Sequence, residues 1–153
     1  MFRSLITIFL LLLWGTAVAA GNDQGTFRCR PTTPDADGPF YRAGAPERSS
    51  VGKGYILSGT VRSADDCAIR PGAKIEIWLN GPDGRYGDDW RATLYAKPDG
   101  TYRFESHVPV PYGSRPPHIH LIVNAAGFKE LITQHYPEQE AKAATFDLVL
   151  IPQ

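Results

Sequence analysis

The segment A-K-I-E-I-W-L from Ala73 to Leu79, followed by the turn G-P-D-G from Gly81 to Gly84, decides the predicted fold. Apolar and β-branched residues dominate the first part, as they do in β-strands. The second part combines Gly, Pro and Asp, which form turns and end strands. These residues therefore predict one strand followed by a tight turn.

The pattern recurs along the rest of the sequence. Four more strands are expected, at Tyr55–Val61, Tyr102–Val108, His118–Asn124 and Thr145–Ile151. Turn formers separate them, at Pro71-Gly72, Pro98-Asp99-Gly100 and Ala126-Gly127. The longest helical candidate, 137–144, is short. Regularly spaced strands without crossover helices predict an all-β fold, an antiparallel β-sandwich.

Length and composition predict one folded domain. The chain has 153 residues, of which 42% are apolar and 21% charged, as in an ordinary globular protein. Sixteen Lys and Arg residues balance sixteen Asp and Glu residues, so no net charge draws the protein towards nucleic acid. Residues 21–53 are rich in Gly, Pro, Asp, Ser and Thr and predict an extended N-terminal arm, while 54–153 form the sandwich domain.

Residues 1–20 have the pattern of a secretory signal peptide. Arg3 precedes an apolar run from Leu5 to Trp14, and small residues lead to Ala19 and Ala20, where cleavage is expected. The alternative, an uncleaved membrane anchor, is disfavoured because the run is shorter than the ~20 apolar residues that span a bilayer. We therefore expect export, to the periplasm or outside the cell, without a stable membrane anchor.

Export changes what the two cysteines predict. Cys29 and Cys67 can form a disulfide in an oxidising compartment, which would tie the arm to the domain. Two unpaired thiols are the alternative. Neither cysteine has a partner at C-x-x-C spacing, so a thiolate metal site is not predicted.

The stretch from Pro111 to His120, P-Y-G-S-R-P-P-H-I-H, carries the chemistry. Residues two apart in a strand share a face, so His118 and His120 can present both imidazoles to one metal ion while Ile119 faces the core. Two histidines on a solvated face would show the same spacing and bind nothing. Tyr112 lies just upstream, and a second tyrosine, Tyr86, follows the turn after Leu79.

In order along the chain, these motifs resemble the intradiol ring-cleavage dioxygenase family, relatives of protocatechuate 3,4-dioxygenase and catechol 1,2-dioxygenase. The resemblance covers nearly all of the sequence after the expected signal peptide. Its motifs are GPFY, Leu-x-Gly-x-Val, Gly-Ala-x-x-Glu-x-Trp, Gly-x-Tyr, Asp-Gly-x-Tyr-x-Phe, Arg-Pro-x-His-Ile-His and Leu-x-Thr-Gln, at 38–41, 57–61, 72–78, 84–86, 99–104, 115–120 and 131–134.

The resemblance implies an enzyme with one non-haem ferric ion, Fe(3+), held by Tyr86, Tyr112, His118 and His120. It implies cleavage of a catechol-type ring by O2 to a muconate-type diacid, with Arg115 and Gln134 beside the substrate. Tyr112 would be the ligand that leaves when substrate binds. Phenolate is a hard oxygen donor that suits a trivalent ion.

Two other interpretations stay open. A non-catalytic transthyretin-like binding module would share most of the strand motifs, although it has no use for the two tyrosines, two histidines and Arg115. Zinc or copper could also bind His118 and His120. Trp78, Tyr102, Phe104 and Phe146 are expected in the core, Phe40 and Tyr41 either in the core or near the pocket, and His107 and His135 outside the site. The sequence leaves the particular catechol and the oligomeric state undetermined.

Overall fold

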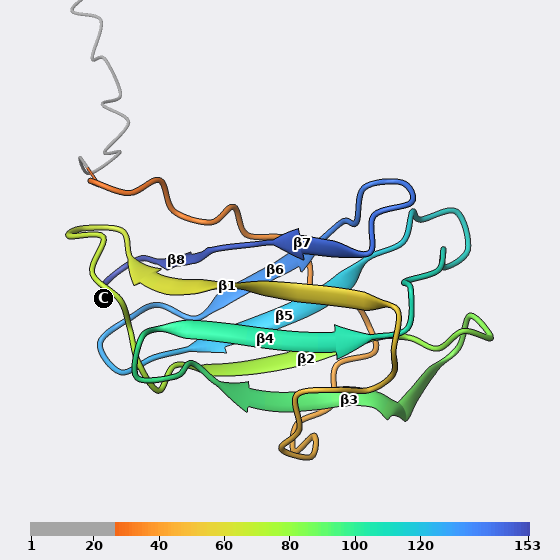
Figure 1. Ribbon diagram of the computed structural model, residues 1–153. Coiled ribbons are helices and arrows are strands. Elements are labelled where there is room, and N and C mark those ends of the chain that lie inside the picture. Colours follow the sequence, from red (N-terminus) through yellow and green to blue (C-terminus); the bar gives the residue numbers. More distant parts are fainter. Residues whose placement is uncertain (1–26) are drawn as a thin grey trace, which may run out of the picture.

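The computed structural model describes residues 27–153, which form two β-sheets packed face to face (Figure 1). The predicted signal peptide and the first residues of the predicted arm lie outside this part. The strands are β1 Tyr55–Ser63, β2 Lys74–Asn80, β3 Tyr86–Tyr95, β4 Thr101–Ser106, β5 Ile119–Asn124, β6 Leu131–His135, β7 Ala143–Thr145 and β8 Leu148–Leu150. No helix occurs among them, so the predicted all-β sandwich is confirmed. The described residues accordingly contain no helix that could cross a bilayer.

One sheet has the order β4-β1-β7 with β8 also paired to β1, and the other has the order β3-β2-β5-β6. Most pairs are antiparallel, but β7 and β8 run parallel to β1. The prediction of a single strand at Thr145–Ile151 is wrong, because β7 and β8 are separate strands with Phe146 and Asp147 between them. At this break the Asp147 carboxylate accepts a hydrogen bond from the Thr60 amide. The helical candidate at 137–144 forms no helix, because its last residues pair with β1.

Strands β3 and β6 were not predicted from the sequence. β3 begins Tyr-Gly-Asp-Asp, which is polar because this end of the strand is largely exposed at the edge of the sheet. β6 has only five residues, too few to show a clear period. Both strands matter for the site, since β3 starts at Tyr86 and β6 carries Gln134.

The sheet β3-β2-β5-β6 has two buried faces of different character. Ile75, Ile77, Leu121 and Val123 point into the core between the sheets. The opposite face carries a row of residues in register across all four strands: Arg91, Trp78, His120 and Gln134. Paired residues in adjacent strands point to the same side. The row therefore crosses the outer face of this sheet and brings a predicted metal ligand and a predicted substrate residue together.

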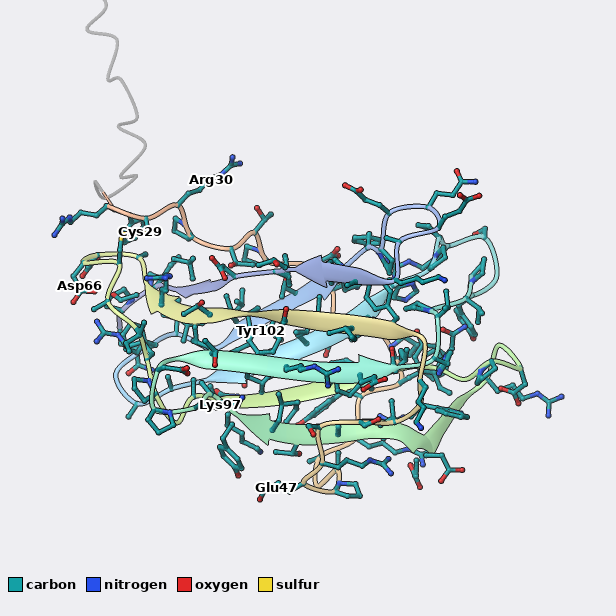
Figure 2. All side chains as sticks on the ribbon, viewed as in Figure 1. Cys29, Arg30, Glu47, Asp66, Lys97 and Tyr102 are labelled. Atoms are coloured by element: carbon teal, nitrogen blue, oxygen red, sulfur yellow. A yellow bond between two sulfur atoms is a disulfide. The ribbon has the colours of Figure 1, made fainter. Side chains whose placement is uncertain are left out.

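The N-terminal arm covers that outer face. It starts beside β1 and β8, where the Cys29 amide donates to the Ala64 carbonyl, and passes β6, where the Asp35 amide donates to the Ile132 carbonyl. It then reaches β3, where the Thr93 amide donates to the Pro46 carbonyl and the Arg48 amide donates to the Thr93 carbonyl. Figure 2 shows the two ends of this path, Cys29 and Glu47, on opposite sides of the fold. From Cys29 to Arg48 the chain is thus held against both sheets by backbone hydrogen bonds.

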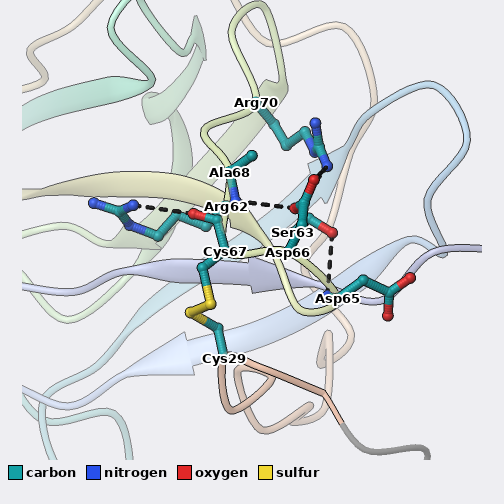
Figure 3. The surroundings of a disulfide bond; sticks show 8 residues. All are labelled: Cys29, Arg62, Ser63, Asp65, Asp66, Cys67, Ala68 and Arg70. Carbon is teal, nitrogen blue, oxygen red and sulfur yellow. Dashed lines mark hydrogen bonds and ion pairs between the residues drawn. A yellow bond between two sulfur atoms is a disulfide. The ribbon is translucent and has the colours of Figure 1, made fainter.

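A disulfide bond joins Cys29 to Cys67 and confirms the predicted pairing (Figure 3). Cys67 lies in the turn after β1, and its carbonyl accepts a hydrogen bond from the Arg62 guanidinium at 3.1 Å. The bond closes a segment with a sequence separation of 38 residues. It ties the start of the arm to the β1 turn.

Candidate active site

Three of the four predicted ligand side chains meet at one point. The Tyr86 hydroxyl lies 3.1 Å from the Nε2 atom of His118 and 3.1 Å from the Nε2 atom of His120. His120 is in β5, His118 immediately precedes it, and Tyr86 opens β3 opposite Asn80. Ile119, between the histidines, is fully buried in the core, as the strand period predicts.

The two imidazoles are buried and fixed in orientation. The Nδ1 atom of His118 lies 2.8 Å from the Pro116 carbonyl, so Nδ1 carries the proton and Nε2 keeps its lone pair. The His120 ring stacks on the Trp78 indole. Burial lowers the pKa of His118, and it lowers the pKa of His120 to about 3, with His118 and Arg115 adding to the effect. Both rings are therefore neutral at pH 7, the form that binds metal.

Tyr112 lies in the loop before β5, as predicted. The loop is closed by hydrogen bonds between the backbones of Tyr112 and Arg115, and Gly113 takes a φ of 56° at its tip. The Asn80 side chain donates to the Pro111 carbonyl at 3.1 Å, which anchors the loop to the end of β2. The Tyr112 ring lies edge-on to the Tyr86 ring, with 5.2 Å between centroids. Tyr112 thus stands beside the three converging groups.

The arm forms one wall of the site. Phe40 stacks on Tyr86 with ring centroids 4.2 Å apart, and its edge meets Tyr112. Gly38 has a φ of 70°, and a Cβ there would lie 3.2 Å from Cε1 of His120. The GPFY motif therefore needs glycine for both its backbone angle and its close approach. Phe40 therefore packs against two of the predicted ligands, while Tyr41 packs on Trp78 and donates to Glu76.

Arg115 and Gln134, which the resemblance predicts beside the substrate, lie in contact with each other. Nη2 of Arg115 donates to Oε1 of Gln134 at 2.8 Å and to the Tyr136 hydroxyl at 2.8 Å. The Tyr136 hydroxyl also lies 2.9 Å from the carboxylate of Asp35 in the arm. A cavity of about 430 Å³ between the arm and β6 is lined in part by Asp35, Gln134 and Tyr136. The network is therefore open to solvent on this side.

Without a bound cation, the Tyr86 hydroxyl keeps its proton at neutral pH. Burial raises the pKa of Tyr86 to about 12, and the nearby Arg115 acts in the opposite direction. A phenolate at neutral pH would require a further positive charge close to the hydroxyl oxygen. Within residues 27–153 no group of three or more His, Cys, Asp and Glu residues could supply a conventional metal site. The donors gathered here are instead two imidazoles and tyrosine hydroxyls.

Known proteins with similar sequences are chlorocatechol, catechol and hydroxyquinol 1,2-dioxygenases. The chlorocatechol 1,2-dioxygenase of Pseudomonas putida is 34% identical in an alignment that covers 72% of this chain and 55% of that protein. The solved chlorocatechol 1,2-dioxygenase of Pseudomonas putida superposes with a TM-score of 0.68 at 26% identity, over 78% of this chain and 72% of that one. The chain belongs to the intradiol ring-cleavage dioxygenase family.

A third protein, also of known structure, has the same fold and is matched over its whole length. The dioxygenase domain of a carbohydrate-binding fusion protein from Streptomyces sp. SirexAA-E matches over 81% of this chain and all of that domain, with a TM-score of 0.72 and 24% identity. The chain spans about half the length of the curated relatives it matches. No protein-family model matches it.

Some residues of this candidate site were not predicted from the sequence. Trp78, expected in the core, is 1% exposed but lies on the outer face, stacked on His120. Its alternation with Ile75 and Ile77 could have placed it there. Tyr136 follows Gln134 at the same-face spacing of two, so it could also have been found. Asp35 could not have been found, because its contact with Tyr136 spans 101 positions.

The other aromatic residues expected in the core are found there. Tyr102 and Phe104 are in the core, and Phe146 packs against it.

His107 and His135 lie outside the site, as expected. Nε2 of His107 bonds to the Asn80 carbonyl at 2.9 Å, and Nε2 of His135 bonds to the Tyr55 hydroxyl at 2.7 Å. Both are partnered structural residues at strand ends. This leaves His118 and His120 as the two described histidines near Tyr86.

Proposed function

We propose that the protein is an exported ferric dioxygenase that cleaves a catechol-type ring between its two hydroxyl-bearing carbons, using O2, to give a muconate-type diacid. The observation that carries the proposal is the convergence of the Tyr86 hydroxyl with the two Nε2 atoms, each at 3.1 Å, beside Arg115 and Gln134. A non-catalytic transthyretin-like module has no need of this arrangement.

The donor set fits a ferric ion. Both Nε2 atoms face the Tyr86 oxygen with no other protein partner among the described residues, so the same three atoms can turn to a cation. Tyr86, Tyr112, His118 and His120 would hold it. Two phenolates offset two of the three positive charges, which makes burial of the ion tolerable. Imidazole alone also suits zinc and copper, but a pair of phenolates favours iron.

A ferric ion held by these residues would be bound by both oxygens of a catecholate, and it would supply the electron withdrawal that makes the ring reactive towards O2. The protein's own residues then have separate tasks. Tyr112, on the loop, is the ligand proposed to leave and accept a substrate proton. The Arg115 guanidinium can offset negative charge that develops on the ring. The Gln134 amide orients Arg115 through the 2.8 Å hydrogen bond. Phe40 and Trp78 exclude water from two sides.

Export is part of the proposal. The signal-peptide pattern at 1–20 supports it, and so does the bond between Cys29 and Cys67, since disulfides persist in oxidising compartments. The periplasm and the extracellular space both meet that condition.

The test is oxygen uptake by iron-loaded protein with catechol, protocatechuate, hydroxyquinol and methoxylated or caffeoyl catechols. We expect uptake with at least one compound and a ring-opened diacid carrying two oxygen atoms from labelled O2, measured by mass spectrometry. Zinc-loaded protein should be inactive. A Tyr95→Phe variant, changed on the exposed end of β3, serves as a matched control and should keep full activity. No uptake with any compound would favour the binding module.

A further inference from the structure

We infer that Asp35 and Tyr136 are positioning residues that hold the Arg115 guanidinium in the substrate pocket, so that the N-terminal arm takes part in catalysis. This rests on the proposed function of the same site. Neither residue touches the proposed metal ligands through a hydrogen bond, and neither belongs to a motif of the sequence. Their role follows from how three segments meet: the arm, the loop before β5, and β6.

The Tyr136 hydroxyl is the centre of the network. It accepts a hydrogen bond from Arg115 Nη2 at 2.8 Å and lies 2.9 Å from Asp35 Oδ2 and 3.0 Å from Gln134 Oε1. A phenol has one hydrogen to donate. Donation to the carboxylate is favoured because hydrogen bonds to charged acceptors are stronger. Gln134 Oε1 is then free to accept from Arg115. Each hydrogen bond thus has a consistent direction, from Arg115 to Tyr136 to Asp35.

Asp35 is itself fixed by the backbone. Its amide donates to the Ile132 carbonyl of β6 at 2.9 Å, and its Oδ1 atom accepts from the Ala36 amide at 2.7 Å. The next residue holds the other end of the network, because the Ala36 carbonyl accepts from the Gln134 side-chain amide. Two successive arm residues therefore orient both side chains that the proposed reaction needs.

Arg115 needs such support because of its place in the chain. It ends the turn that starts at Tyr112 and is half-buried, and no described carboxylate lies within ion-pair distance of its guanidinium. A long side chain on a loop has many rotamers, and fixing one costs conformational entropy. The hydrogen bonds that Arg115 donates to Tyr136 and Gln134 select one orientation in advance of substrate binding. The negative charge of Asp35, reached through one hydroxyl, favours that orientation without neutralising Arg115 by direct contact.

The experiment compares Asp35→Asn and Tyr136→Phe with Asp37→Asn, a matched control. Asp37 is an exposed aspartate two positions along the same arm, with no side-chain hydrogen bond among the described contacts. In iron-loaded protein we expect kcat for the best catechol to fall about tenfold in the first two variants, because small displacements of a positioned group are costly. Iron content and the visible tyrosinate-to-iron band should stay unchanged. Asp35→Glu should recover part of the rate.

A second measurement needs no activity. In metal-free protein, nitrogen-detected NMR of the Arg115 side chain should show slow guanidinium rotation in wild type and Asp37→Asn, and fast rotation in Asp35→Asn and Tyr136→Phe. If wild-type protein consumes no oxygen and the variants still show these differences in guanidinium rotation, the proposed function is refuted and the positioning role of Asp35 and Tyr136 stands. Equal rotation in Asp35→Asn and Asp37→Asn, with equal kcat if the enzyme is active, would overturn the inference.

Discussion

The Trp78 indole lies parallel to the His120 imidazole, with ring centroids 4.8 Å apart and an interplanar angle of 6°. The two residues are direct neighbours across β2 and β5, so the contact follows from strand register. Trp78 closes one side of His120, and the arm residue Gly38 approaches the same ring. The orientation of this proposed ligand therefore depends on two residues that donate nothing to the metal.

Replacing Trp78 by Leu should lower the affinity for ferric iron by roughly tenfold, since groups that orient a metal ligand typically contribute this much. Trp78→Phe keeps an aromatic face and should lose less. Chelator competition measures the affinity, and Trp90→Phe, which alters a ring packed on His107 instead, is the control. Equal affinities in wild type and Trp78→Leu would show that the stacking has no part in holding the metal.

The four proposed ligands should differ in what they do. Tyr112→Phe should keep iron through the other three residues while turnover falls greatly, because Tyr112 is the ligand proposed to leave. His118→Ala and His120→Ala should lose most of the iron, because each removes a donor from a set of four. Metal analysis and the tyrosinate-to-iron absorption report both effects. Wild-type protein with bound ferric iron and no such absorption would contradict the two-tyrosinate assignment.

Gly38→Ala should be more harmful than Gly44→Ala. Both glycines have positive φ, 70° and 81°, so alanine meets a backbone cost of about 1–2 kcal/mol at either position. At Gly38 the new Cβ would also lie 3.2 Å from the His120 ring, whereas nothing lies within 4 Å at Gly44. Chemical denaturation and iron affinity should therefore separate the two variants. If iron affinity is equal in both, the approach to His120 has no functional effect.

Acid should destabilise the metal-free protein through its buried histidines. Burial lowers the pKa of His135 to about 4. Between pH 6.5 and about 4 the unfolded chain binds a proton at this residue and the folded protein does not, so the free energy of unfolding falls as pH falls through this window. His135→Gln should make the dependence shallower, although His107, His118 and His120, whose pKa values are also lowered, keep part of it. Urea denaturation at several pH values measures the slope, and an unchanged slope would contradict this account.

Removing the disulfide with Cys29→Ala and Cys67→Ala should lower the free energy of unfolding by about 4 kcal/mol, the chain-entropy value for a loop of this size. The effect should reach the site, because the arm that follows Cys29 supplies Asp35, Gly38 and Phe40. Hydrogen exchange at the amides of Thr32 and Asp35, which bond to Val149 and Ile132, reports the loosening directly. Unchanged exchange at both amides would show that backbone pairing alone holds the arm.

The sequence determined the parts of this protein that depend on local spacing. Strand period placed Ile119 in the core and both histidines on the opposite face, and turn residues marked most strand ends. Family motifs supplied Tyr86, Tyr112, Arg115 and Gln134. Two cysteines in a chain with a signal-peptide pattern sufficed to pair Cys29 with Cys67.

The tertiary structure decided what depends on contacts between distant segments. Asp35 meets Tyr136 across 101 positions, and Phe40 meets Tyr86 because backbone hydrogen bonds lay the arm over one sheet. The register of β2 against β5 made Trp78 a neighbour of His120 rather than a core residue. The strands β3 and β6 were too polar or too short to predict, and their pairing with β2 and β5 stabilises them. Local periodicity indicates which face a residue occupies, whereas only the packed chain determines what covers that face.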